Sequence, residues 1–469
     1  NCRIKWENNL SEPFHITSGV LQGGMISPKL FTEYLYGLGS YLDSSSGVVL
    51  NELLLFYLLY ADDLVLCSDS PDGLQKQLNG LFNFCKHWHI SVNLAKTKVL
   101  VFNRRNESSK FYYNGCLIEQ SNKYKYLGVW FNTVKHEYLA TTKEYLVEQA
   151  NKALFQVYKI SCPVIGRLSP QVAFKVFDSQ ILPILEYGSE VWFENKCIPE
   201  MEKFQLKFLK STLSVRTQTT SDAVYAETGR IPLYIRNKVK ALKYWVRILN
   251  LPEINPVKNS YCTLKNLDSL GQTNWCTKIR KLLNDLGHLN IWNEQKIVNE
   301  ETFIDECQKA LIRQYTSDCL HRIKQSAHSE GKLRSYQQYK DHFNMEAYLE
   351  VIKDARYRTA LTRFRLSSHN LEIEIGRHSK PKIPQEQRTC RKCNTGLVED
   401  ELHFLLVCPK YATSRQTLLD TIIIHIPHLL TLSLTQQFKE IMRCSETPCL
   451  LQLGKFIYEG FRENNNVTV

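Results

Sequence analysis

The sequence predicts an α+β fold: an antiparallel sheet with helices, followed by a mainly α-helical region and a small cysteine-rich element. Up to about residue 131, short apolar runs typical of strands alternate with segments of helical periodicity. From there to about residue 380, apolar residues recur at helical spacing and prolines punctuate the chain. Cysteines and a histidine at metal-ligand spacing follow near the C-terminal end.

The composition narrows the class of protein. The 469 residues carry a formal net charge of +12, which suits nucleic acid as a partner, with a merely basic soluble protein as the alternative. The 15 cysteines are irregularly spaced and no apolar signal segment opens the chain, so we expect a reducing compartment. The most apolar stretch, residues 418–434, is broken by an aspartate, two histidines and a proline, so we expect no membrane span.

The first elements are indicated by their end signals. Residues 2–6 are typical of a strand that enters a turn at Asn8-Asn9. Ser27-Pro28 predicts a helix with serine at its cap, and apolar residues at helical spacing continue to Leu42. Ser70-Pro71 predicts a second helix in the same way.

Further strands are expected before residue 131. Residues 99–102 form an apolar run that predicts a strand. Asn114-Gly115 lies between two aromatic or aliphatic runs, which is the strongest short hairpin signal. Tyr124 to Phe131 predicts one further strand.

The helical region contains one face of special interest. The face is apolar and comprises Phe204, Phe208, Leu209 and Leu213. Basic residues surround it, namely Lys203, Lys207, Lys210 and Arg216. These cations form either a solvated face or a nucleic-acid groove. Residues 378–391 are rich in proline and charge and predict a linker or loop.

The four residues Tyr60-Ala61-Asp62-Asp63 carry the strongest chemical signal. They lie between the apolar runs 53–59 and 64–67, each typical of a buried strand, so we expect a tight hairpin with two acids at its bend. Adjacent carboxylates are costly to bury unless a positive charge neutralises them. Mg²⁺ takes carboxylate oxygens together with substrate phosphates, so the pair indicates metal-dependent phosphoryl transfer.

A glycine-rich loop precedes the acids by about forty residues. It contains Gln22, Gly23 and Gly24 and leads into the helix that begins at Ser27. Glycines let a backbone approach a flat ligand closely, and a helix N-terminus favours anionic groups. Loops of this kind are common, so the loop alone is a weak signal.

A second set of residues has metal-ligand spacing. Cys390 and Cys393 are followed by His403 and Cys408, a good set for tetrahedral Zn²⁺. The alternative is three buried cysteines and a surface histidine. A closed structural site would organise a nucleic-acid-binding surface and perform no chemistry itself.

The order of the motifs resembles the palm of a reverse transcriptase, specifically the type encoded by non-LTR (LINE-type) retrotransposons. Gln-Gly-x-x-x-Ser-Pro is followed by Tyr-Ala-Asp-Asp, then Asn93 to Lys98, then Tyr126-Leu127-Gly128-Val129. The resemblance covers residues 1–131. The cysteine set is also similar to the zinc-knuckle-like Cys-Cys-His-Cys element downstream of LINE-type reverse transcriptases.

The resemblance implies roles for individual residues. Asp62 and Asp63 match the metal-binding aspartate and the acid beside it, and Lys96 matches a lysine proposed to assist the leaving pyrophosphate. Lys96 could equally be a solvated lysine. The remaining matches line the nucleotide, the template or the primer: Gln22, Gly23, Tyr60, Ala61, Tyr126, Leu127 and Gly128. Less specific similarity extends to residues 229–233 and 363–369, with Arg363, Arg365 and Arg377 as candidate phosphate contacts or ordinary surface arginines.

The resemblance also implies a division of the chain. Residues 1–131 would be the palm, 132–250 a helical thumb, 251–385 a helical linker, 386–412 the zinc element and 413–469 a helical tail. Reverse transcriptases imply Mg²⁺ (or Mn²⁺), an RNA template, a DNA primer or target and deoxynucleotides. The family also implies a nuclear location.

We expect the sequence to be a fragment. In the family another essential aspartate lies on a strand upstream of the Gln-Gly loop, and basic fingers precede it. Glu7 and Glu12 lie in a loop, not on a strand of the right pattern. We therefore expect that this polypeptide alone does not polymerise DNA. The alternative is a catalytically dead remnant that only binds nucleic acid.

Overall fold

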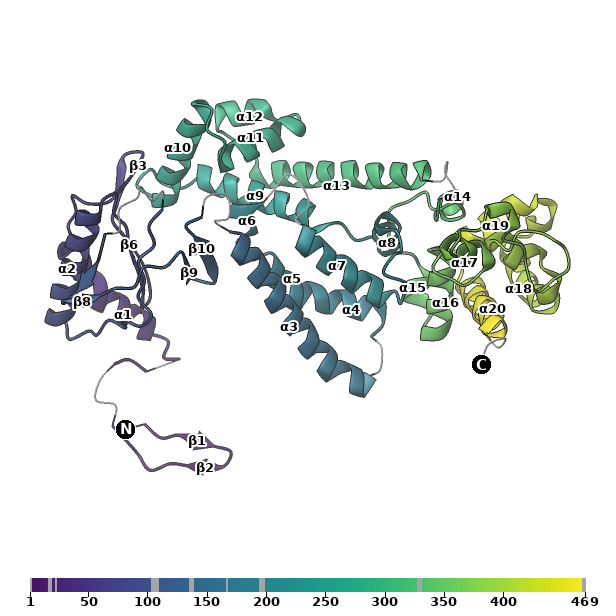
Figure 1. Cartoon of the computed structure of the whole chain (residues 1–469), viewed down its shortest axis with the longest axis horizontal. Helices are drawn as coiled ribbons and strands as arrows, with labels where there is room; N and C mark the ends of the chain where they lie inside the picture. Colours follow the sequence, from purple (N-terminus) through teal and green to yellow (C-terminus); the bar gives the residue numbers. More distant parts are fainter. Residues whose placement is uncertain are drawn as a thin grey trace. The chain divides into compact units, whose positions relative to one another are not determined.

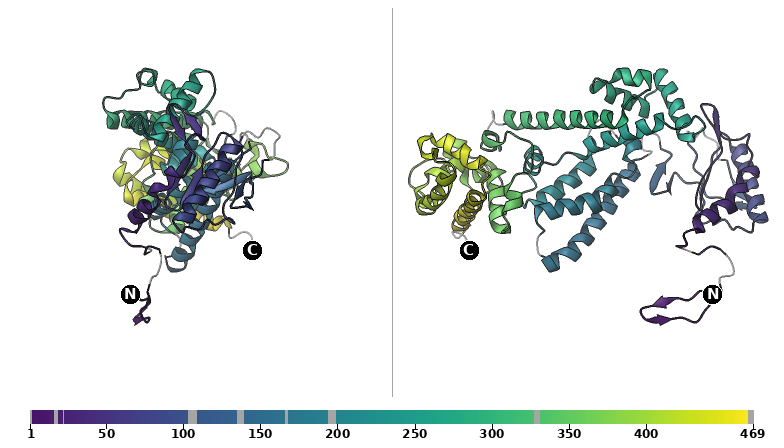
Figure 2. Two further views of the ribbon diagram at one scale, coloured as in Figure 1. Left: turned by 90° about the vertical axis from the view of Figure 1, so that its left-hand side faces the viewer. Right: turned by 180° about the vertical axis from the view of Figure 1, so that it is seen from behind.

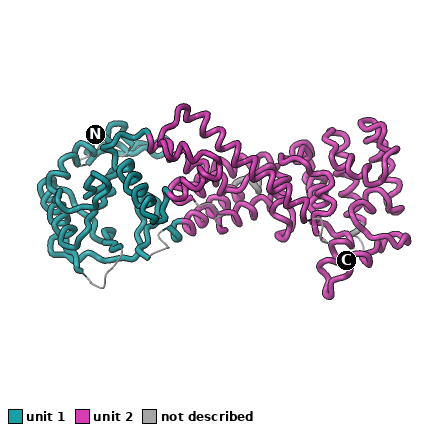
Figure 3. The backbone as a smooth tube through the Cα atoms, turned by 90° about the horizontal axis from the view of Figure 1, so that it is seen from above, with its two compact units in different colours: residues 1–142, 250–276 teal, residues 143–249, 277–469 magenta. Residues whose placement is uncertain are grey.

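The computed structural model describes residues 2–15, 19–21, 23–102, 109–134, 139–165, 168–193, 199–326 and 331–465. The chain forms two compact units (Figure 3). Unit 1 comprises Asn1–Thr142 and Asn250–Cys276, and unit 2 comprises Lys143–Leu249 and Thr277–Val469. The five-part division of the chain stays a prediction.

Unit 1 combines a few helices with short antiparallel hairpins (Figure 1). Its helices are α1 (Ser27–Leu35), the 3₁₀ helix Tyr36–Ser40, α2 (Pro71–His87) and α10 (Pro256–Ser269). Its strands are β1 (Lys5–Trp6), β2 (Asn9–Leu10), β3 (Val48–Leu50), β4 (Leu53–Leu55), β5 (Tyr57–Tyr60), β6 (Asp63–Leu66), β7 (Tyr112–Tyr113), β8 (Cys116–Leu117), β9 (Lys123–Tyr126) and β10 (Val129–Asn132). Among the described residues each strand pairs only with its neighbour in sequence, so five two-stranded sheets replace the expected single sheet.

Two of the hairpins are explained by their turns. Asn114 and Gly115 both adopt positive φ, 48° and 77°, which confirms the predicted β7–β8 hairpin. Leu127 and Gly128 do the same, with φ of 47° and 81°. The prediction of one strand from Tyr124 to Phe131 is therefore wrong, because this turn folds the segment into β9 and β10.

Two other strand predictions need correction. The first turn lies at Glu7 and Asn8, one residue earlier than expected, and Glu7 has a φ of 53°. Residues 99–102 do not form a strand, and Val99 makes one parallel bridge to Gln120 instead. Its amide donates to the Glu119 carbonyl at 3.0 Å.

The helix starts differ from each other. The Ser70 side chain accepts a hydrogen bond from the Gly73 amide at 3.2 Å and caps α2, as predicted. Ser27 does not cap α1. Its hydroxyl donates to the Leu21 carbonyl at 2.7 Å, which ties the helix start to the preceding loop. The apolar positions continue past Leu35 because the 3₁₀ helix follows α1 directly.

The core of unit 1 lies between α1, α2 and the strands. Its buried residues are Leu35, Leu38, Leu42, Leu78, Leu81, Phe84, Cys85, Val99, Phe111, Tyr113 and Ile118. Half-buried side chains of β5 and β6, including Leu59 and Leu64, pack against this core. The hairpin that carries the acids is thus anchored by apolar burial on one side.

Unit 2 is built from helices, and the described residues confirm the predicted helical pattern. Its helices are α3 (Ala140–Ile165), α4 (Pro170–Val176), α5 (Leu182–Leu185), α6 (Ser189–Trp192), α7 (Pro199–Thr212), α8 (Ser221–Thr228), α9 (Leu233–Leu249), α11 (Trp275–Asp285), α12 (Leu289–Glu294), α13 (Glu300–Gln325), α14 (Tyr336–Tyr339), α15 (Tyr348–Val351), α16 (Ala355–Arg365), α17 (Glu372–His378), α18 (Ala412–His425), α19 (Leu434–Arg443) and α20 (Thr447–Asn465). Shorter helical turns are Phe177–Ile181, Gln385–Gln387, His403–Val407, Pro409–Tyr411 and Leu429–Thr431. Figures 1 and 2 show α13 as one long uninterrupted helix.

The predicted apolar face of α7 is confirmed. Phe204, Phe208, Leu209 and Leu213 are all buried, and Phe208 stacks on Phe177 with ring centroids 4.5 Å apart. No helix among the described residues is long and apolar enough to cross a membrane.

A buried ion network joins α8 to α16 within unit 2. The Arg365 guanidinium donates to Glu227 at 2.5 Å and to the Met442 carbonyl at 2.8 Å. The phenols of Tyr336 and Tyr348 also donate to Glu227, at 2.8 and 2.9 Å. Arg365 is therefore no phosphate contact, because its charge is enclosed and paired.

Candidate functional site

The acidic residues lie at the tip of the β5–β6 hairpin. Tyr60 pairs with Asp63 across the two strands, so Ala61 and Asp62 form a two-residue turn. Ala61 has a φ of 51°, a region that L-residues seldom adopt. This tight turn presents both carboxylates at one end of the hairpin.

The two carboxylates are open to solvent. Asp62 and Asp63 are exposed, in contrast to the buried pair that their apolar flanks suggested. Neither side chain makes a hydrogen bond or ion pair with any other described residue. Their oxygens can therefore take part in binding a hard cation, whose preferred ligands are oxygens.

A residue of a second hairpin is within the electrostatic influence of the acids. Tyr126 is the last residue of β9, next to the Leu127-Gly128 turn. Burial raises the pKa of its phenol, and the nearby carboxylate of Asp63 raises it further. The charge of Asp63 therefore acts on Tyr126, while the predicted roles of both residues stay predictions.

Of the other predicted site residues, Gly23 and Lys96 lie among the described residues. Gly23 is exposed with a φ of 79°, while Gln22 lies outside the described residues. Lys96 is exposed, and its backbone amide donates a hydrogen bond to the side-chain oxygen of Asn93 at 3.2 Å. No hydrogen bond or ion pair joins the Lys96 side chain to either aspartate.

In the part of the chain that the structure describes, no third metal-ligand side chain joins Asp62 and Asp63. Groups of three or more histidine, cysteine, aspartate or glutamate side chains occur there at one place, and it is elsewhere in the fold. A two-metal site needs carboxylates from separate segments.

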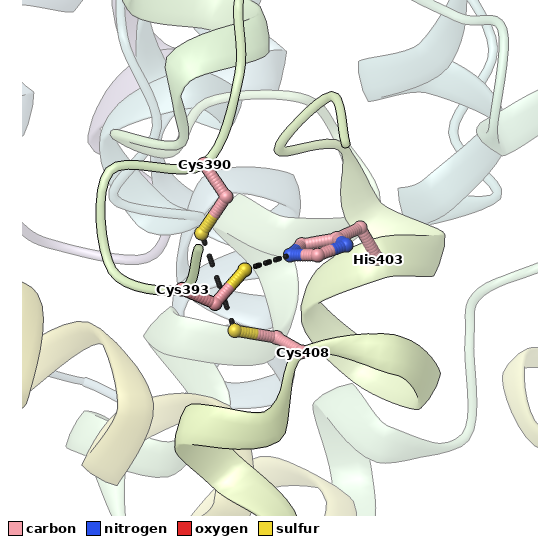
Figure 4. A group of neighbouring side chains, drawn as sticks. All are labelled: Cys390, Cys393, His403 and Cys408. Atoms are coloured by element: carbon pink, nitrogen blue, oxygen red, sulfur yellow. Dashed lines mark hydrogen bonds between the residues drawn. The ribbon is translucent and has the colours of Figure 1, made fainter. Parts of the chain in front are cut away.

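That place is the predicted cysteine cluster in unit 2 (Figure 4). The ligand atoms of Cys390, Cys393, His403 and Cys408 all lie within 4.8 Å of one another, and all four residues are buried. The sulfurs of Cys390 and Cys408 are 4.0 Å apart, and Cys393 Sγ lies 3.4 Å from His403 Nε2. A tetrahedral site with Zn–S distances of about 2.3 Å requires similar edges.

Backbone hydrogen bonds position the four ligands. Thr389 and Val398 form an antiparallel bridge, and the Cys390 amide donates to the Leu397 carbonyl at 2.8 Å. The His403 amide donates to Asp400 Oδ1 at 2.8 Å, which fixes the start of the π-helical turn. The Cys408 amide closes this turn on the His403 carbonyl at 2.7 Å.

The thiols of the cluster are suited to binding a cation. Burial raises the pKa of Cys390 to about 12, and it also raises that of Cys408. Burial opposes ionisation of Cys393 too, but hydrogen bonds from Thr395 outweigh it and lower the pKa of that thiol. Metal binding would supply the charge that lets such thiols ionise.

Two acidic residues around the cluster were missed from the sequence. Glu399 is buried, accepts a hydrogen bond from Cys390 Sγ at 3.7 Å and pairs with Lys392 Nζ at 3.3 Å. Asp400 holds the His403 turn. The acidic run 399–401 just before the histidine is the signal that would have found them.

A family model described as reverse transcriptase (RNA-dependent DNA polymerase) matches residues 2–131. A transposon-derived protein of Caenorhabditis elegans is 28% identical over 193 residues, which cover 40% of this chain and 67% of that protein.

Two named polymerases are also similar. The RNA-directed DNA polymerase from mobile element jockey of Drosophila funebris is 28% identical over 186 residues, 38% of this chain and 19% of that protein. The probable RNA-directed DNA polymerase from transposon BS of Drosophila melanogaster is 27% identical over 135 residues, 27% of this chain and 15% of that protein. In its acidic hairpin, its motif order and these matches, the chain is similar to the reverse transcriptases of LINE-type retrotransposons, and residues 2–131 are the part that matches the reverse transcriptase family.

Proposed function

We propose that the chain forms part of an RNA-directed DNA polymerase that copies retrotransposon RNA at a nicked target DNA. The observation that carries this is the exposed Asp62–Asp63 turn at the tip of the β5–β6 hairpin, within the segment that matches reverse transcriptases. The matched segments span only 19% and 15% of the two named polymerases, so the whole activity is an inference from the family.

Each residue has a proposed role in nucleotidyl transfer. Asp62 and Asp63 would hold a divalent cation, Mg²⁺ or Mn²⁺, which neutralises phosphate charge and activates the attacking hydroxyl when bound. The exposed face of Tyr60, together with Ala61, would lie beside the primer end. The turn at Leu127 and Gly128 would grip the primer from the opposite hairpin.

Other residues would bind the remaining partners. Gln22 and Gly23 would line the incoming nucleotide and the template, and Lys96 would steady the leaving pyrophosphate. Lys96 is exposed and has the reach of a flexible side chain, which suits contact with a mobile anion.

The cysteine cluster has a separate, structural role in this proposal. Cys390, Cys393, His403 and Cys408 would bind one Zn²⁺ with no open ligand position. The metal would hold the loop 389–398 against the turn 403–408 and so stabilise a surface that binds nucleic acid. A nuclear location follows from the use of chromosomal DNA as target.

Primer extension tests the proposal. The product of the whole reading frame that encodes this chain should extend a DNA primer on an RNA template with Mg²⁺, and Asp62→Asn should abolish extension. Extension that persists in Asp62→Asn would contradict the proposal. The same assay on this chain alone tests the expectation that it is inactive by itself.

The second candidate is a remnant that binds nucleic acid without catalysis. It is favoured by one observation, that no third carboxylate joins Asp62 and Asp63 among the described residues, while the cysteine cluster is complete there. Absence of extension by the whole product, with RNA or DNA binding retained, would select this candidate.

A further inference from the structure

Unit 2 gathers basic side chains from separate segments around one surface loop, residues 214–219. We define this basic cluster as Lys210, Arg216, Lys332, Arg363, Arg377 and His378. Its members are up to 168 positions apart in sequence, because Lys210 lies on α7 and His378 ends α17. Only the fold brings them together.

Two lysines are held directly on the loop. Lys210 Nζ donates to the Thr217 carbonyl at 2.7 Å, and Lys332 Nζ donates to the Gln218 carbonyl at 3.3 Å. These adjacent carbonyls set the two ammonium groups side by side at the surface. Both side chains are half-buried, so their positions are restricted before any ligand arrives.

The arginines complete the surface. The amide of Arg216 donates to Ser368 Oγ at 3.0 Å, and its guanidinium donates to Asn370 Oδ1. Arg363 Nε donates to the Ser214 carbonyl at 2.8 Å. Arg216 and Arg363 are both exposed.

Arg377 anchors the opposite side of the cluster. Its guanidinium donates to the Gly331 carbonyl at 3.3 Å, beside Lys332. It also pairs with the carboxylate of Glu374 at 3.2 Å. Glu374 pairs with Arg334 as well and is fully buried, so the accessible charge of the cluster is positive.

The cations are close enough to act on each other. Burial lowers the pKa of Lys332, Glu374 opposes this, and the charges of Arg377 and Arg216 lower it further. Burial and then Lys332 lower the pKa of Lys210. Like charges held this close repel one another, and a bound anion relieves that repulsion.

We propose that the basic cluster binds the phosphodiester backbone of a nucleic-acid strand. The proposal rests on the proposed function for the nature of its ligand. Lysine and arginine are the side chains that contact phosphates, and every member of the cluster except His378 is one or the other. The site therefore gives affinity without reading sequence, and RNA and DNA backbones share the chemistry that it recognises.

Salt-dependent binding tests the proposal. The full chain is titrated into a fluorescent RNA hairpin and, separately, a DNA duplex, at several KCl concentrations. The double variant Arg216→Gln/Lys332→Gln should weaken binding at least about fivefold and reduce the slope of log K against log salt by about two. A loss with one of the two ligands identifies which backbone the cluster prefers.

The matched control removes two charges elsewhere in unit 2. Lys309 and Lys455 are exposed and pair with acids one helical turn away, and Lys309→Gln/Lys455→Gln should leave affinity and slope nearly unchanged. The single variant Arg216→Gln alters an exposed side chain and guards against a folding defect in Lys332→Gln. Unchanged binding in both cluster variants, or an equal loss in the control, would overturn the proposal. The readout is binding, so it can fail or succeed independently of primer extension.

Discussion

The negative charge of Asp63, in the β5–β6 hairpin, raises the pKa of the Tyr126 phenol in the β9–β10 hairpin. Burial is the larger cause of the raised pKa of Tyr126, and the Asp63 carboxylate is the next. The two hairpins come from motifs about sixty residues apart, and their turns are tight and contain left-handed residues. This electrostatic coupling supports the proposal that the acids lie at the primer end.

The Leu127-Gly128 turn should depend on glycine. Gly128 has a φ of 81°, so Gly128→Ala should destabilise the β9–β10 hairpin by about 1 kcal/mol. Amide hydrogen exchange in residues 123–132 measures the effect. The control is Gly37→Ala, where φ is not left-handed and an added Cβ meets nothing within 4 Å. Equal protection in wild type and Gly128→Ala would show that the turn is not as described.

The cysteine cluster should bind one zinc ion per chain. Cys393→Ser removes a sulfur from a set whose ligand atoms lie within 4.8 Å of one another, and zinc content should fall towards zero. Elemental analysis after dialysis measures it. The control Cys116→Ser alters an exposed thiol outside the cluster and should leave zinc bound. Full zinc occupancy in Cys393→Ser would refute the assigned ligand set.

The buried network around Glu227 should contribute strongly to the stability of unit 2. Glu227→Gln leaves the buried Arg365 with Glu346 as its one remaining carboxylate partner among the described residues, so the free energy of unfolding should fall by up to about 3–5 kcal/mol. Urea unfolding followed by helical circular dichroism measures it. The exposed ion pair between Lys309 and Asp305 is the comparison. Lys309→Gln should change the free energy of unfolding by less than about 0.5 kcal/mol. A comparable loss in both variants would contradict the network's role.

Acid should loosen the start of α2 through Asp43. The Ser45 hydroxyl and amide, with Ser46 and Lys76, lower the pKa of Asp43 to about 2, below its ordinary value of 3.8. A lowered pKa stabilises the fold above pH 4, and this stabilisation is lost as pH falls from about 4 towards 2. Hydrogen exchange in α2 should therefore differ between wild type and Asp43→Asn at pH 6, and the difference should shrink by pH 3.

The matching control for Asp43 is Asp69→Asn, which changes an exposed carboxylate close to the start of the same helix. It should give no such pH-dependent difference. A difference between wild type and Asp43→Asn that is as large at pH 3 as at pH 6 would show that another group controls the helix start.

Local signals in the sequence predicted what is local in the structure. Ser70-Pro71 marked a capped helix and Asn114-Gly115 a hairpin, because capping and left-handed turns are determined by a few neighbouring residues. The sequence did not reveal that a turn at Leu127 interrupts the predicted strand, because leucine seldom adopts positive φ. The spacing of Cys390, Cys393, His403 and Cys408 predicted a cluster that the fold does assemble.

Long-range features were not predictable in this way. Arg365 resembled a phosphate contact because nothing nearby in sequence reveals Glu227, its buried partner 138 positions away. The basic cluster likewise depends on Lys332 meeting the loop after α7. The exposure of Asp62 and Asp63 was not predictable either. The apolar runs on both sides of the pair suggested burial, whereas the tip of the hairpin lies at the surface of unit 1.

The most direct test of the central claim, that the Asp62–Asp63 turn binds the catalytic divalent cation, is iron-mediated backbone cleavage. Fe²⁺ in place of Mg²⁺, with peroxide and ascorbate, generates hydroxyl radicals that cut the backbone near the bound ion, and mass spectrometry locates the cuts in the zinc-loaded chain. Cuts should fall in residues 57–66 and 123–132, compete with excess Mg²⁺ and disappear in Asp62→Asn while persisting in Asp69→Asn. Cuts that avoid both hairpins, or that persist unchanged in Asp62→Asn, would contradict the account.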